Sequence, residues 1–352
     1  MLYAKLGQTG LIVSRLSLGT MTFAQDKTSA VAKTGPADAE RIVGRAIDAG
    51  INFFDTADVY SGGESETMLG QAIRARRDEV VLATKAGWRT GPALNQSGLS
   101  AQHLHWSIKQ SLKRLGTDYV DVYIAHRDDA NTPLEETLQA LDTIVRHGKA
   151  RYIGFSNWSA WKVAAALELQ RANGWAPFTH GQMMYSLLGR DIEPEVVPMM
   201  RRYGLGLTAW SPLASGFLSG KYARGAAGGA EDRLADLQQA QFNVEAGFAL
   251  VDQLRPITAT HGASVAQVAI AWLLARDVVS SVILGASKLE QLEENLGAAD
   301  LALSADELAV LDAATAPKHG YPATVVNVLD TPIVTALARR PGEPLQKASP
   351  QK

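Results

Sequence analysis

The stretch INFFDTADVYSGGESETMLGQAIRA, residues 51–75, holds one complete strand, loop and helix. Its first four residues form a short apolar run typical of a buried strand, and the apolar residues of 64–75 recur at the spacing of one helical face. Asp55 ends the strand, and Tyr60 follows in the loop five residues later. A carboxylate and a phenol at a strand end mark this loop as a candidate functional segment.

The same alternation of strand and helix continues along the chain. Expected strands lie at 15–20, 51–55, 80–85, 119–126, 150–156, 179–185, 204–212 and 281–287. Expected helices lie at 38–49, 64–76, 101–115, 134–147, 159–172, 193–203, 244–260, 265–275 and, last, 288–296. Eight such units predict a (β/α)8 TIM barrel, which takes about 250 residues plus insertions. A doubly wound sheet is the alternative.

Three kinds of segment lie outside the repeating units. YAKLGQTGLIVS, residues 3–14, predicts a β-hairpin that turns at Thr9-Gly10 and caps the barrel floor. The long loops 21–37, 86–100 and 213–243 all follow strands, so we expect them on the carboxyl-end face where barrel enzymes keep their sites. We expect one barrel domain over 1–315 and a tail over 316–352 that partly covers the site and is partly disordered.

The bulk composition argues against several classes of function. A net charge of -2 without a dense basic run gives no case for nucleic acid. The absence of cysteine excludes disulfides, thiol catalysis and Cys-ligated zinc. We find no secretory signal and no window near the ~20 apolar residues of a membrane span. We therefore expect a cytoplasmic protein without a membrane partner; a homo-oligomer remains possible.

Polar side chains end several of the expected strands, and these ends converge on one mouth in a closed barrel. Asp55, Lys85 and His126 end the second, third and fourth strands. Taken singly, Asp55 could cap a turn, Tyr60 could be a surface phenol, and His126 could bond within a core. Lys85 could alternatively form a Schiff base. Their occurrence together at consecutive strand ends favours a catalytic site.

The chemistry that suits these four residues is proton donation to a carbonyl oxygen. A free phenol has a pKa of about 10, and a nearby ammonium lowers it. A carboxylate keeps a buried lysine charged, so Asp55 would hold Lys85 charged and Lys85 would tune Tyr60. His126 would orient the substrate oxygen. No metal site is expected, because His103 and His105 lie two apart on a helix and point to different faces.

Several ordered motifs resemble the aldo-keto reductase superfamily over roughly residues 2–300. They include LGQTGLIVSRLSLGTMTF (6–23), GINFFDTADVYSGGESETMLG (50–70), SLKRLGTDYVDVYIAHRDD (111–129) and LGASKLEQLEENL (284–296). Two further stretches, NTPLEET (131–137) and SPLASGFLSGKY (211–222), resemble the bacterial reductases related to potassium-channel β subunits.

The resemblance implies a barrel that binds NADPH in extended form without a Rossmann domain, with NADH possible, and that reduces a small-molecule carbonyl substrate. It agrees with the lack of a G-x-G-x-x-G motif after any expected strand. It implies a catalytic tetrad of Asp55, Tyr60, Lys85 and His126, with Tyr60 the general acid. The cofactor-binding residues that it implies are Thr20, Met21, Asp55, Ser156, Asn157, Gln182, Trp210, Ser211, Leu213, Gly216, Lys221, Gly285, Ser287, Gln291, Glu294 and Asn295.

Charge and helix position add two residues to this cofactor set. The GAS segment 285–287 opens the last expected helix, where free N–H groups and the helix dipole favour a phosphate. Lys288 and Lys221 could recognise a 2′-phosphate there, and Arg233 could close over the cofactor from the long loop. Many superfamily members carry an Arg where Gln291 stands, which leaves the preference for NADPH over NADH open.

The expected substrate pocket is walled by Phe23, Trp88, Arg127, Trp158 and the tail, and its aromatic residues suit an apolar or aromatic carbonyl. Trp158 and Trp161 could instead pack a helix. Arg127 could attract an anionic substrate or pair with Asp128 or Asp129. Aldehydes, ketones, keto-steroids and oxidised xenobiotics all remain open as substrates, as does the physiological direction.

Two other functions remain as alternatives. The channel β subunits have Asn where this chain has His126, so a complete tetrad favours catalysis over a slow or non-catalytic NADPH-sensing regulatory subunit. A Schiff-base lyase would leave Tyr60 and the Ser287 segment without a role.

Overall fold

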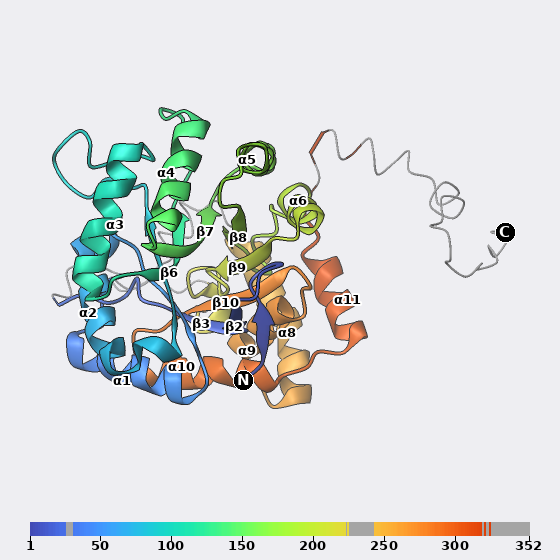
Figure 1. Ribbon diagram of the computed structural model, residues 1–352. Coiled ribbons are helices and arrows are strands. Elements are labelled where there is room, and N and C mark those ends of the chain that lie inside the picture. The colour runs from blue at the N-terminus through green and yellow to red at the C-terminus, as the bar shows by residue number, and fades with distance from the viewer. Residues whose placement is uncertain (26–30, 223, 225–242, 319, 322–323, 325–352) are drawn as a thin grey trace. The chain divides into compact units, whose positions relative to one another are not determined.

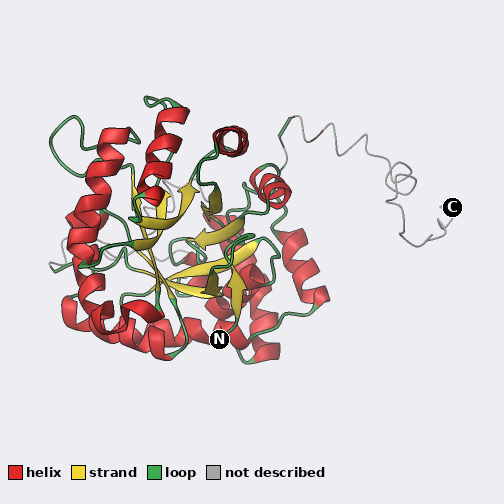
Figure 2. Ribbon diagram, in the orientation of Figure 1, coloured by secondary structure: helices red, strands yellow, loops and turns green. Residues whose placement is uncertain are grey.

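Eight parallel strands close into a barrel in the order β10-β3-β4-β5-β6-β7-β8-β9, surrounded by helices (Figures 1 and 2). The strands are β3 (Leu16–Gly19), β4 (Phe53–Asp55), β5 (Val81–Ala86), β6 (Val120–Ala125), β7 (Ala150–Ser156), β8 (Phe178–Met184), β9 (Gly206–Trp210) and β10 (Val279–Gly285). The predicted TIM barrel is confirmed. The doubly wound alternative is wrong, because each strand is hydrogen-bonded to two neighbours around a closed circuit.

The structure describes residues 1–25, 31–222, 224, 243–318, 320–321 and 324. Arg233 lies outside these residues, as does most of the expected tail. Contacts within the chain divide it into Met1–Thr315, which contains the barrel, and Ala316–Lys352.

The helices that follow the strands lie close to the ranges expected from the sequence. They are α1 (Pro36–Asp48), α2 (Glu64–Ile73), α3 (Ala101–Leu115), α4 (Leu134–Arg146), α5 (Ala160–Asn173), α6 (Val196–Tyr203), α8 (Val244–His261), α9 (Val265–Leu274), α10 (Leu289–Leu296) and α11 (Ala305–Ala314). Short 3-10 turns lie at Tyr60–Gly63, Arg74–Glu79, Phe217–Ser219 and Gly297–Asp300. The outward faces of the strands pack against these helices in one large apolar cluster.

The expectation that the helix over 288–296 is the last one was wrong, because α11 follows it. Leu311 is the only fully buried residue of α11, so its apolar periodicity is weak. A capping box marks its start: Ser304 accepts from the Glu307 amide, and the Glu307 carboxylate accepts from the Ser304 amide. The S-x-x-E spacing of these two residues was the sequence signal for this helix.

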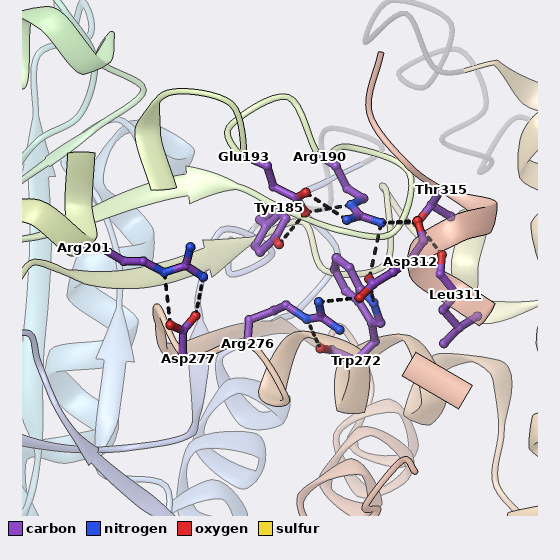
Figure 3. Close-up of polar contacts among 10 residues, drawn as sticks. All are labelled: Tyr185, Arg190, Glu193, Arg201, Trp272, Arg276, Asp277, Leu311, Asp312 and Thr315. Atoms are coloured by element: carbon purple, nitrogen blue, oxygen red, sulfur yellow. Dashed lines mark hydrogen bonds and ion pairs between the residues drawn. The ribbon is translucent and has the colours of Figure 1, made fainter. Parts of the chain in front are cut away.

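A polar network fastens α11 to the barrel (Figure 3). Asp312 accepts from Trp272 Nε1 at 2.9 Å and from Arg276 Nη1 at 3.0 Å. Arg190 donates to the Asp312 carbonyl and to Thr315 Oγ1, and it forms an ion pair with Glu193. The guanidinium groups of Arg190 and Arg276 both lie against the Trp272 ring. Charge and hydrogen bonds therefore supply most of the polar contacts that hold α11 in place.

The N-terminal hairpin consists of β1 (Tyr3–Lys5) and β2 (Ile12–Ser14), as predicted. Thr9 Oγ1 donates to the Leu6 carbonyl and accepts from the Leu11 amide, which fixes the turn. Leu6 and Val13 pack inside the barrel against Phe53, Val81, Ala83, Val122 and Ile124. The hairpin therefore closes the amino-end floor of the barrel.

No single described helix has the length and apolar composition of a membrane span; α8 and α9 meet that test only jointly, as a bent pair.

Candidate active site

The structure brings Asp55, Lys85, Tyr60 and His126 together at the carboxyl-end mouth. Lys85 Nζ donates to Asp55 Oδ1 at 2.6 Å and to the Tyr60 hydroxyl oxygen at 3.2 Å. It also donates to the Thr56 carbonyl at 2.7 Å, which uses its three donors. The Tyr60 and His126 rings meet edge to face, with centroids 5.8 Å apart. The four residues lie at one mouth as the strand ends predicted, and Asp55 pairs with Lys85 as expected.

The turn after Tyr60 explains how a loop residue reaches over Lys85. Ser61, Gly62 and Gly63 all adopt positive φ values of 49°, 64° and 98°. Glycine takes such values without strain, whereas Ser61 needs support, which its hydroxyl obtains by donating to the Phe23 carbonyl at 2.9 Å. The chain therefore turns sharply into α2 and leaves the phenol facing the mouth.

Burial sets the ionisation of the two groups that share a proton. Burial raises the pKa of Tyr60, and the Lys85 ammonium opposes this shift. Lys85 lowers the pKa of Tyr60 as expected, but burial raises it by more. The expectation of a lowered Tyr60 pKa was therefore wrong for the net shift. Burial lowers the pKa of Lys85, but Asp55 and Tyr60 more than offset this, so the pKa is raised. The pair is therefore a protonated phenol beside a charged ammonium.

His126 is held neutral. Burial, followed by the positive charges of Lys85 and Arg127, lowers the pKa of His126 to about 2. Its Nδ1 atom is buried without a hydrogen-bond partner among the described residues. A neutral imidazole can position a substrate oxygen without competing with Tyr60 as the proton source.

Asp58 is a buried acid beside the site that sequence reasoning missed. Its Oδ2 accepts from Ser107 on α3 at 2.6 Å, and its Oδ1 has no described partner. Burial raises the pKa of Asp58 to about 7, with the Ser107 hydrogen bond opposing the shift. Glu66, Arg114 and Lys85 are the charged groups that act on it. Its place three residues after Asp55 in the same loop was the available signal.

Asn157 forms hydrogen bonds to groups at the carboxyl ends of three strands, β6, β7 and β9. Its amide nitrogen donates to the His126 carbonyl at 3.3 Å and to Ser156 Oγ at 2.9 Å. Its oxygen accepts from Trp210 Nε1 at 3.2 Å, and its φ of 59° lies in the left-handed region that Asn tolerates better than most residues with a side chain. Gln182 donates to Asp55 Oδ2 at 2.8 Å. These residues fix the rim beside the tetrad.

The loop after β9 forms a tight, left-handed turn. Ser211, Ala214, Ser215 and Gly216 all have positive φ values. The Ser211 hydroxyl accepts from the Ser215 amide, and the Leu213 carbonyl accepts from the Gly216 amide. A Cβ at Gly216 would meet no described residue within 4 Å. A run of left-handed backbone at a barrel mouth can present N–H groups to an anionic ligand.

The segment before α10 also fits an anion, although its amides are occupied by a side chain of this chain. Gln291 Oε1 accepts from the Ser287 amide at 2.8 Å, the Ser287 hydroxyl at 3.1 Å and the Lys288 amide at 3.3 Å. Lys288 is exposed beside them. A phosphate could replace this amide oxygen on the same donors.

The remaining candidate residues differ in exposure. Thr20 is fully buried, and its hydroxyl bonds the Asp55 carbonyl and Ser65. Asn295 is buried as well. The exposed candidates are Met21, Lys221, Gly285 and Glu294.

The four expected pocket residues also separate into two groups. Phe23 is fully buried in the main core cluster, and Trp158 packs with Phe155 and Phe178 in the same cluster. Trp88 is 43% exposed and meets the His126 ring edge to face at 6.2 Å. The guanidinium of Arg127 lies 4.5 Å from the centre of the Trp88 ring. Trp88 and Arg127 therefore line the mouth together.

Comparisons with known proteins identify the family of this chain. Residues 15–316 match the Aldo/keto reductase family. The chain is 42% identical over 321 residues to a protein of Oryza sativa subsp. japonica named "Probable voltage-gated potassium channel subunit beta". It is 41% identical over 314 residues to a protein of the same name from Arabidopsis thaliana. Each alignment covers 86% of this chain and 92% of the relative.

Proposed function

This chain belongs to the aldo/keto reductase family, and from that premise we propose that it reduces an aldehyde or ketone to the alcohol with NADPH. Membership supports an oxidoreductase in a family that typically binds NAD(P)H. The finer proposal is that Tyr60 is the general acid. The observation that carries it is the contact of Lys85 with both Asp55 at 2.6 Å and the Tyr60 hydroxyl at 3.2 Å.

The proton transfer follows from the charges of this cluster. Burial keeps the Tyr60 phenol protonated at neutral pH, so the proton is available for donation. As the proton leaves, the adjacent Lys85 ammonium stabilises the phenolate, and Asp55 keeps that ammonium charged. Neutral His126 orients the carbonyl oxygen beside the phenol. Because the Lys85 charge is already in place, the developing negative charge on Tyr60 is stabilised in the transition state without any rearrangement of solvent.

The mouth has groups that suit a nicotinamide dinucleotide. Ser156, Asn157 and Gln182 offer amide and hydroxyl groups for a carboxamide, and Trp210 offers an aromatic face. The left-handed turn 211–216 suits a pyrophosphate, and Ser287 with Lys288 suits a 2′-phosphate. When bound, the cofactor would supply the hydride to the carbonyl carbon.

A second candidate function is that of a cofactor-sensing regulatory subunit. The names of the rice and Arabidopsis relatives favour it. The presence of His126 and the close packing of the tetrad support catalysis over it. Turnover of a carbonyl substrate distinguishes the two functions.

The decisive experiment is to follow the loss of reduced-nicotinamide absorbance with purified protein. NADPH and NADH are offered separately with aromatic aldehydes, ketones and dicarbonyls. Tyr60→Phe should lower turnover by on the order of 10²–10⁴ while leaving the Kd for NADPH close to that of the wild type. Tyr3→Phe is the matched control, because Tyr3 lies on the N-terminal hairpin away from the mouth and its hydroxyl donates to the Gly50 carbonyl.

Equal turnover by Tyr60→Phe and the wild type would exclude Tyr60 as the acid. Tight NADPH binding without turnover of any carbonyl would favour the regulatory subunit.

A further inference from the structure

Arg127 carries a positive charge at the mouth that no described carboxylate pairs. Of the two acidic residues that follow it, Asp128 forms an ion pair with Lys162. Asp129 accepts hydrogen bonds from the Leu99 amide, the Asn131 amide and Thr132 Oγ1. Among the described residues no ion pair within 4.0 Å therefore joins Arg127 to Asp128 or Asp129, and the Arg127 charge acts on Asp129 only at longer range.

The guanidinium of Arg127 is nevertheless held in a defined place. Its Nε donates to the Gly87 carbonyl at 3.4 Å, and its Cζ lies 4.5 Å from the centre of the Trp88 ring. An arginine stacked on an aromatic face keeps the edge of its fork available for a planar anion. The terminal nitrogens make no hydrogen bond to any described residue, so they retain their capacity to donate.

Arg127 lies close to His126, the proposed catalytic histidine, through the Trp88 ring. Trp88, on which Arg127 rests, meets the His126 ring at 6.2 Å, and His126 in turn meets Tyr60 at 5.8 Å. Successive contacts through the His126 and Trp88 rings thus connect the phenol to the guanidinium. Arg127 therefore belongs to the same group of contacting side chains as the proposed acid, and a ligand bound at Tyr60 would meet its charge near the mouth.

We propose that Arg127 and Trp88 form an anion subsite, so that the preferred substrates are carbonyl compounds carrying a carboxylate or phosphate a short distance from the reacting carbon. Trp88 would contact the body of such a substrate while Arg127 binds its anionic end in a bidentate manner. This proposal rests on the proposed reductase function and goes beyond it by naming the charge class of the substrate.

The test compares isosteric substrates that differ in charge. The acid 4-carboxybenzaldehyde is paired with the neutral 4-formylbenzamide, and 4-formylphenyl phosphate supplies the phosphate arm. In the wild type, kcat/KM for the acid should exceed that for the amide. Arg127→Met should lower this ratio roughly 10- to 100-fold, mainly through KM, as expected for a hydrogen bond to a charged group. The ratio of kcat/KM for each anionic aldehyde to that for the amide is then compared. The anion with the larger ratio, carboxylate or phosphate, is the one that the subsite prefers.

Two further variants make the result specific. Arg127→Lys keeps the charge but loses the fork, so its ratio should lie between those of the wild type and Arg127→Met. Arg41→Met is the matched control, because Arg41 lies on α1 with its side chain 63% exposed and paired with Asp38. Its ratio should equal that of the wild type. A wild-type preference for the amide, or an unchanged ratio in Arg127→Met, would overturn the subsite.

A binding measurement keeps this result separate from failure of the reductase function. If no aldehyde is reduced, the reductase proposal fails, and calorimetric titration of benzoate and benzamide into protein loaded with NADP⁺ tests the subsite alone. Tighter binding of benzoate that Arg127→Met abolishes would support it. Equal binding of both compounds, or an effect that Arg127→Met leaves unchanged, would refute it.

Discussion

Lys85 Nζ lies 2.6 Å from Asp55 Oδ1, and the two side chains are 0% and 4% exposed. A buried pair of this kind is costly to break from one side, because the remaining charge then has no partner. Asp55 also receives the Gln182 amide, so its carboxylate is anchored from β5 and from β8. The pair therefore places a positive charge beside Tyr60 and also connects strands β4, β5 and β8 of the barrel.

Replacing Lys85 by Met should abolish most turnover and destabilise the fold. We expect kcat to fall on the order of 10²–10⁴ and the free energy of unfolding to fall by about 3–5 kcal/mol, because Asp55 is left buried and unpaired. Urea denaturation measures the second effect. The double variant Asp55→Asn/Lys85→Met should recover a large part of the stability but none of the activity. A double variant less stable than Lys85→Met would contradict this account.

Asp58 should make stability depend on pH. Its folded-state pKa of about 7 is raised from 3.8, so the stabilisation from protonated Asp58 is complete below about pH 4 and is lost as pH rises to about 7. Asp58→Asn removes this titration. As the pH rises from 5 to 8, the free energy of unfolding of the variant should increase by on the order of 2 kcal/mol relative to that of the wild type. Urea denaturation at each pH measures this difference. Parallel stability profiles for the two proteins would rule this out.

Lys288 should contribute to discrimination between the two nicotinamide cofactors. The Lys288→Met variant should raise the Kd for NADPH by about 3- to 10-fold and leave that for NADH unchanged, because only NADPH carries the 2′-phosphate. Fluorescence titration at low and high salt checks this, and salt should shrink the difference. Lys113→Met on α3 serves as the control. An equal effect on both cofactors would remove Lys288 from phosphate recognition.

The network around Asp312 should stabilise the chain, whereas the neighbouring Arg201–Asp277 pair should not (Figure 3). Asp312→Ala leaves the buried Trp272 Nε1–H unpaired and removes the carboxylate between two guanidinium groups, so we expect a loss of about 1–3 kcal/mol. Arg201→Ala breaks an exposed pair and should cost about 0–1 kcal/mol. Thermal unfolding of both variants compares them, and similar losses would refute the distinction.

Local patterns predicted most of the fold. The run INFF and the periodic residues of 64–75 needed only their own spacing to be identified, and β4 and α2 formed there. Eight such units leave no sheet edge once they close, which explains why the whole barrel followed from repetition. The helix α11 was missed because charge and hydrogen bonds hold it, and these leave little apolar periodicity.

The sequence by itself determined the alternation of strand and helix, the polar residues at the strand ends, and the family that they share with known reductases. Only the tertiary structure decided the states of those residues. Gln182 hydrogen-bonds Asp55 across 127 positions of sequence, and Asp128 and Asp129 form their close contacts with residues other than Arg127. The pKa directions of Tyr60, His126 and Asp58 depend on burial. Charge and pairing are properties of distance and of exposure to water, and folding sets both.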